Sequence, residues 1–105
     1  MNIELLYSEG CHTWERTLEM LKQVLKDKNI DVEVKLVKIA TQEDAEKHHY
    51  FGSPQINING KDIDPMAEKV TSYKSAGCRL YIYKEETYEL PPKEMLEEAL
   101  DKIVK

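Results

Sequence analysis

Tyr7-Ser8-Glu9-Gly10-Cys11-His12-Thr13-Trp14 is the stretch that decides the predicted fold, because it connects an apolar strand to a long amphipathic helix. Residues 3–7 are predicted to form a buried strand, which Gly10 ends, and the helix is expected from about Cys11 to Lys28. A cysteine at such a junction lies close to unpaired helical N–H groups and to the positive end of the helix dipole. Both effects favour a thiolate over a thiol, so Cys11 is the predicted reactive sulfur.

A second informative stretch, residues 51–58, places a Ser53-Pro54 bond directly before an apolar strand. The sequence on either side predicts four elements: a strand over 32–39, a helix from the cap residue Thr41 to about Tyr50, a strand over 54–58, and a returning strand over 61–64 after an Asn59-Gly60 turn. The alternation within 32–39 shifts by one residue, which predicts a bulge or burial on both faces.

The last part of the chain predicts one more strand and one more helix. Residues 66–77 show no clear pattern, residues 78–83 alternate with Leu80 and Ile82 on one face, and a helix is expected over 92–104. The order β-α-β-α-β-β, inserted strand, α predicts an α/β fold with a mixed sheet and helices on both faces, forming a single domain over residues 1–105.

Composition restricts the classes of partner. The 105 residues are 41% hydrophobic and 33% charged with a net charge of −5, and acidic and basic residues are interspersed. This distribution argues against a nucleic-acid partner or an anionic membrane surface. The first residues do not resemble a signal peptide and no apolar run is long enough to cross a membrane, so a cytoplasmic location is expected. Two cysteines are too few for a disulfide scaffold.

Two other features have structural explanations. Trp14 belongs to the apolar stripe of the first helix and is expected in the core. His48 and His49 lie in the last turn of the second helix, where solvated imidazoles interact well with the helix dipole. We therefore assign neither histidine a functional role.

Over residues 1–64 and 92–104 this order of elements resembles the thioredoxin-like proteins. The chain is also similar to small prokaryotic thioredoxin-family proteins with a single cysteine in the Cys-x-x-x motif, on the evidence of Gly10-Cys11, of Gly52-Ser53-Pro54 and of Cys78-Arg79-Leu80-Tyr81. The resemblance implies thiol–disulfide chemistry, with Cys11 at the nucleophile position and Pro54 as a cis-proline facing it. However, there are also related proteins on this fold that only bind their partners and catalyse no reaction.

The chain departs from the usual Cys-x-x-Cys motif, because Trp14 occupies the position of the second cysteine. The leading hypothesis is a redox protein in which Cys11 attacks a disulfide and either Cys78 or a small thiol resolves the product. His12 would help to hold the thiolate, and Ser53 would offer backbone groups to an extended peptide. Arg79 would support a thiolate at Cys78 or hold an acidic group of the substrate.

A non-enzymatic binding module is the alternative hypothesis. It would carry a soft metal ion through Cys11 and Cys78, with His12 as an optional third ligand, or would bind partner peptides beside Pro54. A third possibility is an inert buried cysteine. The leading hypothesis requires no cofactor and no resident metal, its partners are protein or small-molecule thiols and disulfides, and the sequence predicts no oligomeric state. The Cα distance between the two cysteines decides whether Cys78 can pair with Cys11, because a disulfide requires about 4.4–6.8 Å and a much larger distance would leave Cys11 as a lone thiol.

Overall fold

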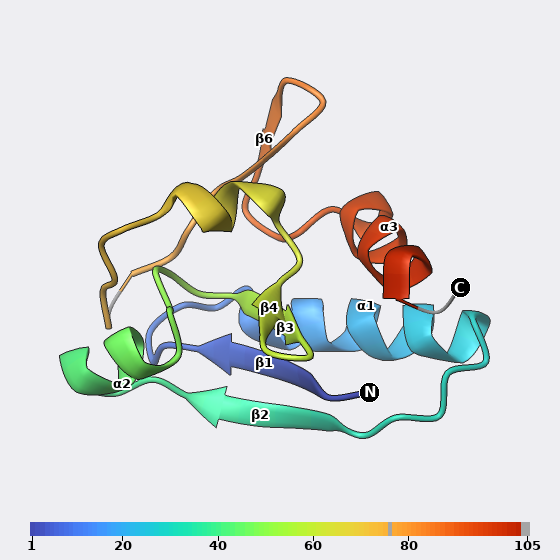
Figure 1. The fold of residues 1–105 in the computed structure, drawn as a ribbon, viewed down its shortest axis with the longest axis horizontal. Helices are drawn as coiled ribbons and strands as arrows, with labels where there is room; N and C mark the ends of the chain where they lie inside the picture. Colours follow the sequence, from blue (N-terminus) through green and yellow to red (C-terminus); the bar gives the residue numbers. More distant parts are fainter. Residues whose placement is uncertain (76, 104–105) are drawn as a thin grey trace.

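A mixed four-stranded sheet organises the protein, which is described by a computed structural model over residues 1–75 and 77–103 (Figure 1). The strands lie in the order β2-β1-β3-β4. The bounds are Ile3–Tyr7 for β1, Val34–Lys38 for β2, Gln55–Ile58 for β3 and Lys61–Asp62 for β4. β1 pairs in parallel with β2 and antiparallel with β3, and β3 pairs antiparallel with β4. The predicted mixed sheet is therefore confirmed.

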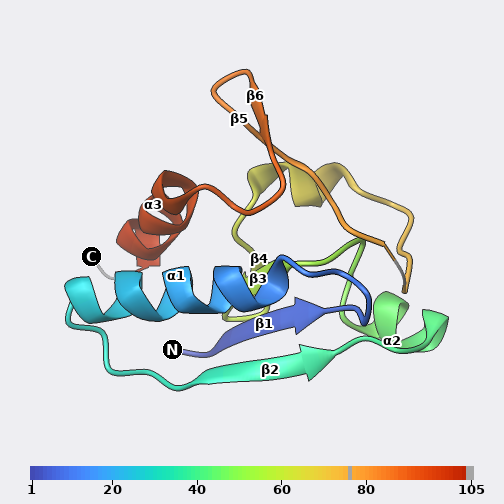
Figure 2. The ribbon, with the colours of Figure 1, turned by 180° about the vertical axis from the view of Figure 1, so that it is seen from behind.

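Two helices cover one face of this sheet. α1 (Trp14–Asp27) and α3 (Lys93–Ile103) form the main apolar cluster with alternate residues of the central strands, such as Leu5 and Ile56. Figure 2 shows α1 lying along the sheet with α3 beside it. Trp14 is half-buried, packs against this cluster and stacks on Tyr7 with 4.2 Å between ring centroids.

The third helix belongs to a smaller cluster. Leu6 points away from Leu5 because successive side chains of a strand alternate between faces. It packs with Ile39, with Ala45 of α2 (Gln42–Lys47) and with Tyr50. α2 lies beyond the ends of β1 and β2, beside the start of the loop after β1 (Figure 1). The sheet therefore has helical contacts on both faces.

Several predicted boundaries were too wide. α1 begins at Trp14 rather than Cys11, and α2 ends at Lys47 rather than Tyr50 because His49 has a positive φ of 53°. β2 is shorter than predicted and lies at a sheet edge, where Leu36 is 45% exposed, so two-sided burial was wrong. Its pairing with β1 also advances one residue at a time, without a bulge. Val104, predicted in the last helix, lies outside the described residues.

The largest error concerns the inserted strand. After a short 3₁₀ helix (Pro65–Lys69), β5 (Tyr81–Tyr83) and β6 (Glu86–Tyr88) form a separate antiparallel hairpin that projects from the sheet (Figures 1 and 2). Leu80 and Ile82, predicted on the apolar face, are each 63% exposed. Arg79 and Tyr81 are buried instead. The alternation was read correctly, but its phase was reversed.

In the described part of the chain, none of the helices has both the length and the apolar character that a membrane span requires.

Candidate functional site

A disulfide joins Cys11 and Cys78, which are 67 residues apart in the sequence. Their Cα atoms are 5.8 Å apart, within the range of about 4.4–6.8 Å that a disulfide requires. The two residues differ in accessibility, because Cys11 is 4% exposed whereas Cys78 is exposed. The fold therefore brings the two cysteines of the sequence into one site, with one of them at the surface.

The loop that carries Cys11 is fixed by polar contacts. The Ser8 hydroxyl lies 2.5 Å from the Tyr50 hydroxyl and donates to the carbonyl oxygen of Ser75 at 2.8 Å. Beyond this anchor, the Thr13 hydroxyl lies 3.4 Å from Cys11 Sγ. Thr13 is the N-cap residue of α1, but its side chain makes no capping hydrogen bond, so the hydroxyl is available to the sulfur.

Cys78 is held beside the Ser53–Pro54 bond, which is cis as predicted. Ser53 and Cys78 form an isolated parallel bridge. The Ser53 N–H donates to the Gly77 carbonyl oxygen at 3.1 Å, and the Arg79 N–H donates to the Ser53 carbonyl oxygen at 2.9 Å. Both backbone groups of Ser53 are therefore bonded within the chain, including the groups predicted to bind an extended peptide.

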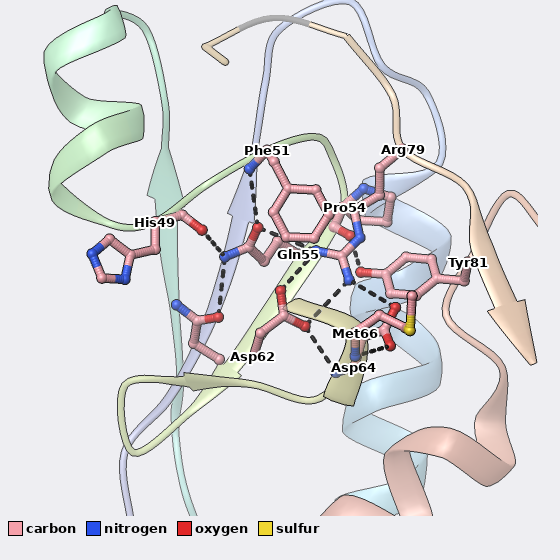
Figure 3. A network of polar contacts seen from close by, with 10 residues as sticks. His49, Phe51, Pro54, Gln55, Asp62, Asp64, Met66, Arg79 and Tyr81 are labelled. Atoms are coloured by element: carbon pink, nitrogen blue, oxygen red, sulfur yellow. Dashed lines mark hydrogen bonds and ion pairs between the residues drawn. The ribbon is translucent and has the colours of Figure 1, made fainter. Parts of the chain in front are cut away.

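Arg79 anchors the segment that carries Cys78 (Figure 3). Its side chain is 4% exposed and forms a two-point ion pair with Asp62, with Nη1–Oδ2 and Nη2–Oδ1 distances of 2.7 and 3.2 Å. Nη1 also donates to Gln55 at 3.2 Å. The guanidinium carbon lies 4.1 Å from the ring centroids of both Phe51 and Tyr81, which places the cation between two aromatic faces.

This anchor is costly to disturb. Desolvation raises the pKa of the Asp62 carboxyl above its ordinary value, although its hydrogen bonds with Arg79 oppose that effect. Asp64, 3.5 Å from Arg79 Nη2, adds a second carboxylate. Removing one partner from a buried ion pair typically costs about 3–5 kcal/mol, since the other charge is left without compensation. The backbone beside Cys78 is thus held by an interaction that the disulfide does not itself provide.

The predicted site residues have different outcomes. Cys11, Ser53, Pro54 and Cys78 lie together, whereas His12 is exposed and Thr13 is the neighbour whose side chain contacts Cys11 Sγ. The role predicted for Arg79 is wrong, because its guanidinium points inward to Asp62 and not to a thiolate or a substrate (Figure 3).

Sequence reasoning missed Thr13, Phe51 and the acidic partners of Arg79. The pattern Asp62-Ile63-Asp64 after a hairpin turn was a usable signal, because alternate residues of a strand point to the same side. Nothing local to Arg79 identified those carboxylates as its partners, however. The pairing joins residues 15 and 17 positions apart through tertiary structure.

The remaining titratable residues form no further centre in the part of the chain that the structure describes. His48 is half-buried, and His49 is exposed and stacks on Tyr73. Within residues 1–75 and 77–103, no group of three or more His, Cys, Asp or Glu side chains is arranged to hold a metal ion. The disulfide and its supports are therefore the candidate functional site.

Comparison with known families gives one match. A family model described as a domain of unknown function (DUF2703) matches residues 2–100 of the chain. Comparison with curated proteins and with solved structures finds no significant match.

Proposed function

The chain belongs to the DUF2703 family, and we propose that it is a thiol-dependent redox protein whose Cys11–Cys78 disulfide opens and re-forms by thiol–disulfide exchange. Opening the disulfide takes up two electrons from thiols, which are themselves joined in a disulfide. Re-forming it transfers the two electrons to a disulfide of the substrate.

One observation carries the proposal: the two cysteines meet with one buried and one exposed. Exchange requires a thiolate to reach one sulfur of the disulfide. A disulfide that served stability alone would need no access to solvent, whereas Cys78 lies at the surface. Cys78 also takes the part of the second cysteine that the motif at Cys11 lacks.

The arrangement also supports assigning the chain to the thioredoxin-like fold. A parallel β1-α1-β2 unit is followed by the antiparallel pair β3–β4 and by a helix packed on α1. Cys11 lies between β1 and α1, and the cis Ser53–Pro54 bond precedes β3. These two positions carry the resemblance to thioredoxin-like proteins in the sequence.

The binding-module alternatives have less support. A peptide beside Pro54 would compete with residues 77–79 for the backbone groups of Ser53. A soft metal ion would need both cysteines as free thiolates, and no cluster of three ligands is found among the described residues. No observation favours either alternative over the redox proposal.

The reduction potential of the disulfide tests the proposed function. The protein is equilibrated with mixtures of reduced and oxidised glutathione, and the thiols are trapped by alkylation and counted by mass. Thiol–disulfide exchange proteins have potentials between about −120 and −270 mV, whereas structural disulfides in secreted proteins lie below about −300 mV. A value in the first range supports the proposal, and a value in the second shows a structural crosslink.

A further inference from the structure

We propose that Cys78, and not Cys11, is the sulfur through which external thiols and disulfides exchange with this protein, and that Cys11 is the resolving cysteine. This inference rests on the proposed function. It reverses the roles that the position of Cys11 in the motif predicts. It depends on the surroundings of the two sulfurs, which the sequence does not show.

Access to solvent differs between the two residues. Cys11 is 4% exposed and lies on the loop that Ser8 fixes to Tyr50 and Ser75. Cys78 is exposed, and so are its neighbours Gly77 and Leu80. The rate of exchange depends on which sulfur the attacking thiolate can reach. In the oxidised protein, Cys78 is the exposed residue of the two, so its sulfur is the one that we expect a thiolate to reach.

The environment of Cys11 suits a leaving and resolving group. Its sulfur lies 3.5 Å from the carbonyl oxygen of Ser53 and 3.4 Å from the hydroxyl of Thr13. When Cys11 leaves as a thiolate, the Thr13 hydroxyl can donate a hydrogen bond to the charge. When Cys11 takes up a proton, its S–H can donate to the Ser53 oxygen. Because Cys11 is 4% exposed, an external disulfide has little access to it, so Cys11 in the reduced protein is a poor initial nucleophile.

A small thiol such as glutathione can act as the reductant. Its thiolate attacks Cys78 Sγ, forms a mixed disulfide on Cys78, and breaks the bond to Cys11, which departs with the electron pair. A second glutathione thiolate attacks the glutathione sulfur of that mixed disulfide. Glutathione disulfide is released, and Cys78 leaves as a thiolate. The protein has then gained two electrons and two glutathione molecules have lost them.

The reduced protein acts on a substrate disulfide in the opposite direction. The Cys78 thiolate attacks one substrate sulfur and the other substrate sulfur leaves as a thiolate. Cys11 loses its proton and attacks Cys78 Sγ, which closes the Cys11–Cys78 bond and releases the second substrate thiolate. Arg79 and the bridge to Ser53 keep the backbone of Cys78 near Cys11 during this cycle, because neither contact involves the sulfur.

Two single-cysteine variants, Cys11→Ser and Cys78→Ser, test the assignment as a matched pair. Each reduced variant is mixed with oxidised glutathione, and the mixed disulfide is followed by intact mass. We expect Cys11→Ser to acquire glutathione on Cys78, and Cys78→Ser to react more slowly by roughly tenfold or more, because access governs the rate. Equal rates, or faster reaction of Cys78→Ser, would overturn the assignment.

A second measurement avoids dependence on how the variants fold. Reduced wild-type protein receives a short pulse of iodoacetamide and is then digested and mapped. Alkylation of Cys78 before Cys11 supports the inference, and alkylation of Cys11 first refutes it while leaving the proposed redox function in place. If the wild-type disulfide exchanges with glutathione at neither cysteine, the proposed function fails and this inference fails with it.

Discussion

At the scale of single residues, the Thr13 hydroxyl is the side-chain group best placed to tune the disulfide. It lies 3.4 Å from Cys11 Sγ and does not cap α1. Its removal therefore affects the sulfur without removing a helix cap. A hydroxyl donor stabilises a reduced sulfur, most of all when Cys11 leaves as a thiolate, more than it stabilises a disulfide sulfur, so it favours the reduced state.

We expect Thr13→Val to make the reduction potential more negative, because the reduced protein loses this hydrogen bond. A loss of roughly 1 kcal/mol corresponds to about 20 mV for a two-electron couple. Glutathione equilibration of the purified variant measures the shift. Thr13→Ser retains the hydroxyl and is the control. An unchanged potential in Thr13→Val would show that the hydroxyl does not stabilise the reduced sulfur of Cys11.

The sequence predicted correctly those structural features that depend on the local context of a residue. Cys11 lies between a strand and a helix and Pro54 lies directly before a strand, as predicted, and the cis Ser53–Pro54 bond was confirmed. The role predicted from the sequence for the Arg79 side chain was wrong, because that prediction assumed an accessible side chain and charged residues are usually exposed. Arg79 is buried only because Asp62 and Asp64 meet it across the tertiary structure.

At the scale of elements, the segment from Cys78 to Tyr83 shows how tertiary contacts choose the phase of an alternating strand. The apolar pattern favoured burial of Leu80 and Ile82, yet Tyr81 is the residue that is 0% exposed. Its ring contacts the Arg79 guanidinium and its hydroxyl donates to the Pro54 carbonyl oxygen. Hydrophobic alternation fixes the period of a strand, but this anchor determines which face is inside.

Replacement of neighbouring residues by alanine tests this phase. We expect Tyr81→Ala to lower the free energy of unfolding by about 3–5 kcal/mol, as for other large buried aromatic residues. Ile82→Ala, the matched control on the opposite face, should change it by less than about 0.5 kcal/mol. Urea unfolding measures both. A larger effect for Ile82→Ala would mean that the sequence-based phase was correct.

A substitution at Gly52 tests how closely its backbone packs against the segment of Arg79. A Cβ at this position would lie 2.5 Å from the Arg79 Cβ, and the glycine has a φ of 152°. Gly60 also has a positive φ, of 81°, but a Cβ there would meet nothing within 4 Å. Gly60→Ala therefore isolates the backbone strain, which is about 1–2 kcal/mol.

We expect Gly52→Ala to add an overpacking cost of about 1–3 kcal/mol to a comparable strain. Because the clash is with Arg79, it should also displace the segment carrying Cys78. Reduction of the disulfide by glutathione should therefore change rate in Gly52→Ala and not in Gly60→Ala. Urea unfolding and quenched alkylation give the two readouts. Equal behaviour of the variants would argue against tight packing at Arg79.

At the scale of the whole molecule, two buried tyrosines predict loss of stability in alkali. Tyr50 and Tyr81 are both 0% exposed, and desolvation raises the pKa of each hydroxyl above the ordinary value of 10.0. A raised pKa means that folding favours the neutral phenol. The contribution of these phenols to the free energy of unfolding is therefore fully present below about pH 10. Above that pH it falls, by up to about 1.4 kcal/mol per pH unit for each residue.

Urea unfolding as a function of pH, compared with a Tyr50→Phe/Tyr81→Phe double variant, measures this contribution. The variant has no phenols at these positions, so its stability should fall less steeply above pH 10 than that of the wild type. The ionisation of other groups is common to both proteins and cancels in the comparison. Parallel curves would show that these phenols do not control alkaline stability.

The disulfide closes a long loop of the chain, since its cysteines are 67 residues apart in the sequence. On the chain-entropy estimate, a loop of this length stabilises the folded state by about 4 kcal/mol. The ion pair of Arg79 and the bridge between Ser53 and Cys78 do not involve the sulfurs. We therefore expect the reduced protein to remain folded, with its free energy of unfolding lowered by about this amount.

Urea unfolding with and without reductant measures the difference, and a Cys11→Ser/Cys78→Ser double variant should match the reduced wild type. By the thermodynamic cycle, the same roughly 4 kcal/mol makes the potential of the folded disulfide about 90 mV more negative than that of the unfolded chain. A protein that uses this disulfide in exchange must retain its fold when the bond opens, so that Cys11 and Cys78 meet again. Unfolding on reduction would instead identify the bond as a structural crosslink and would contradict the proposed redox cycle.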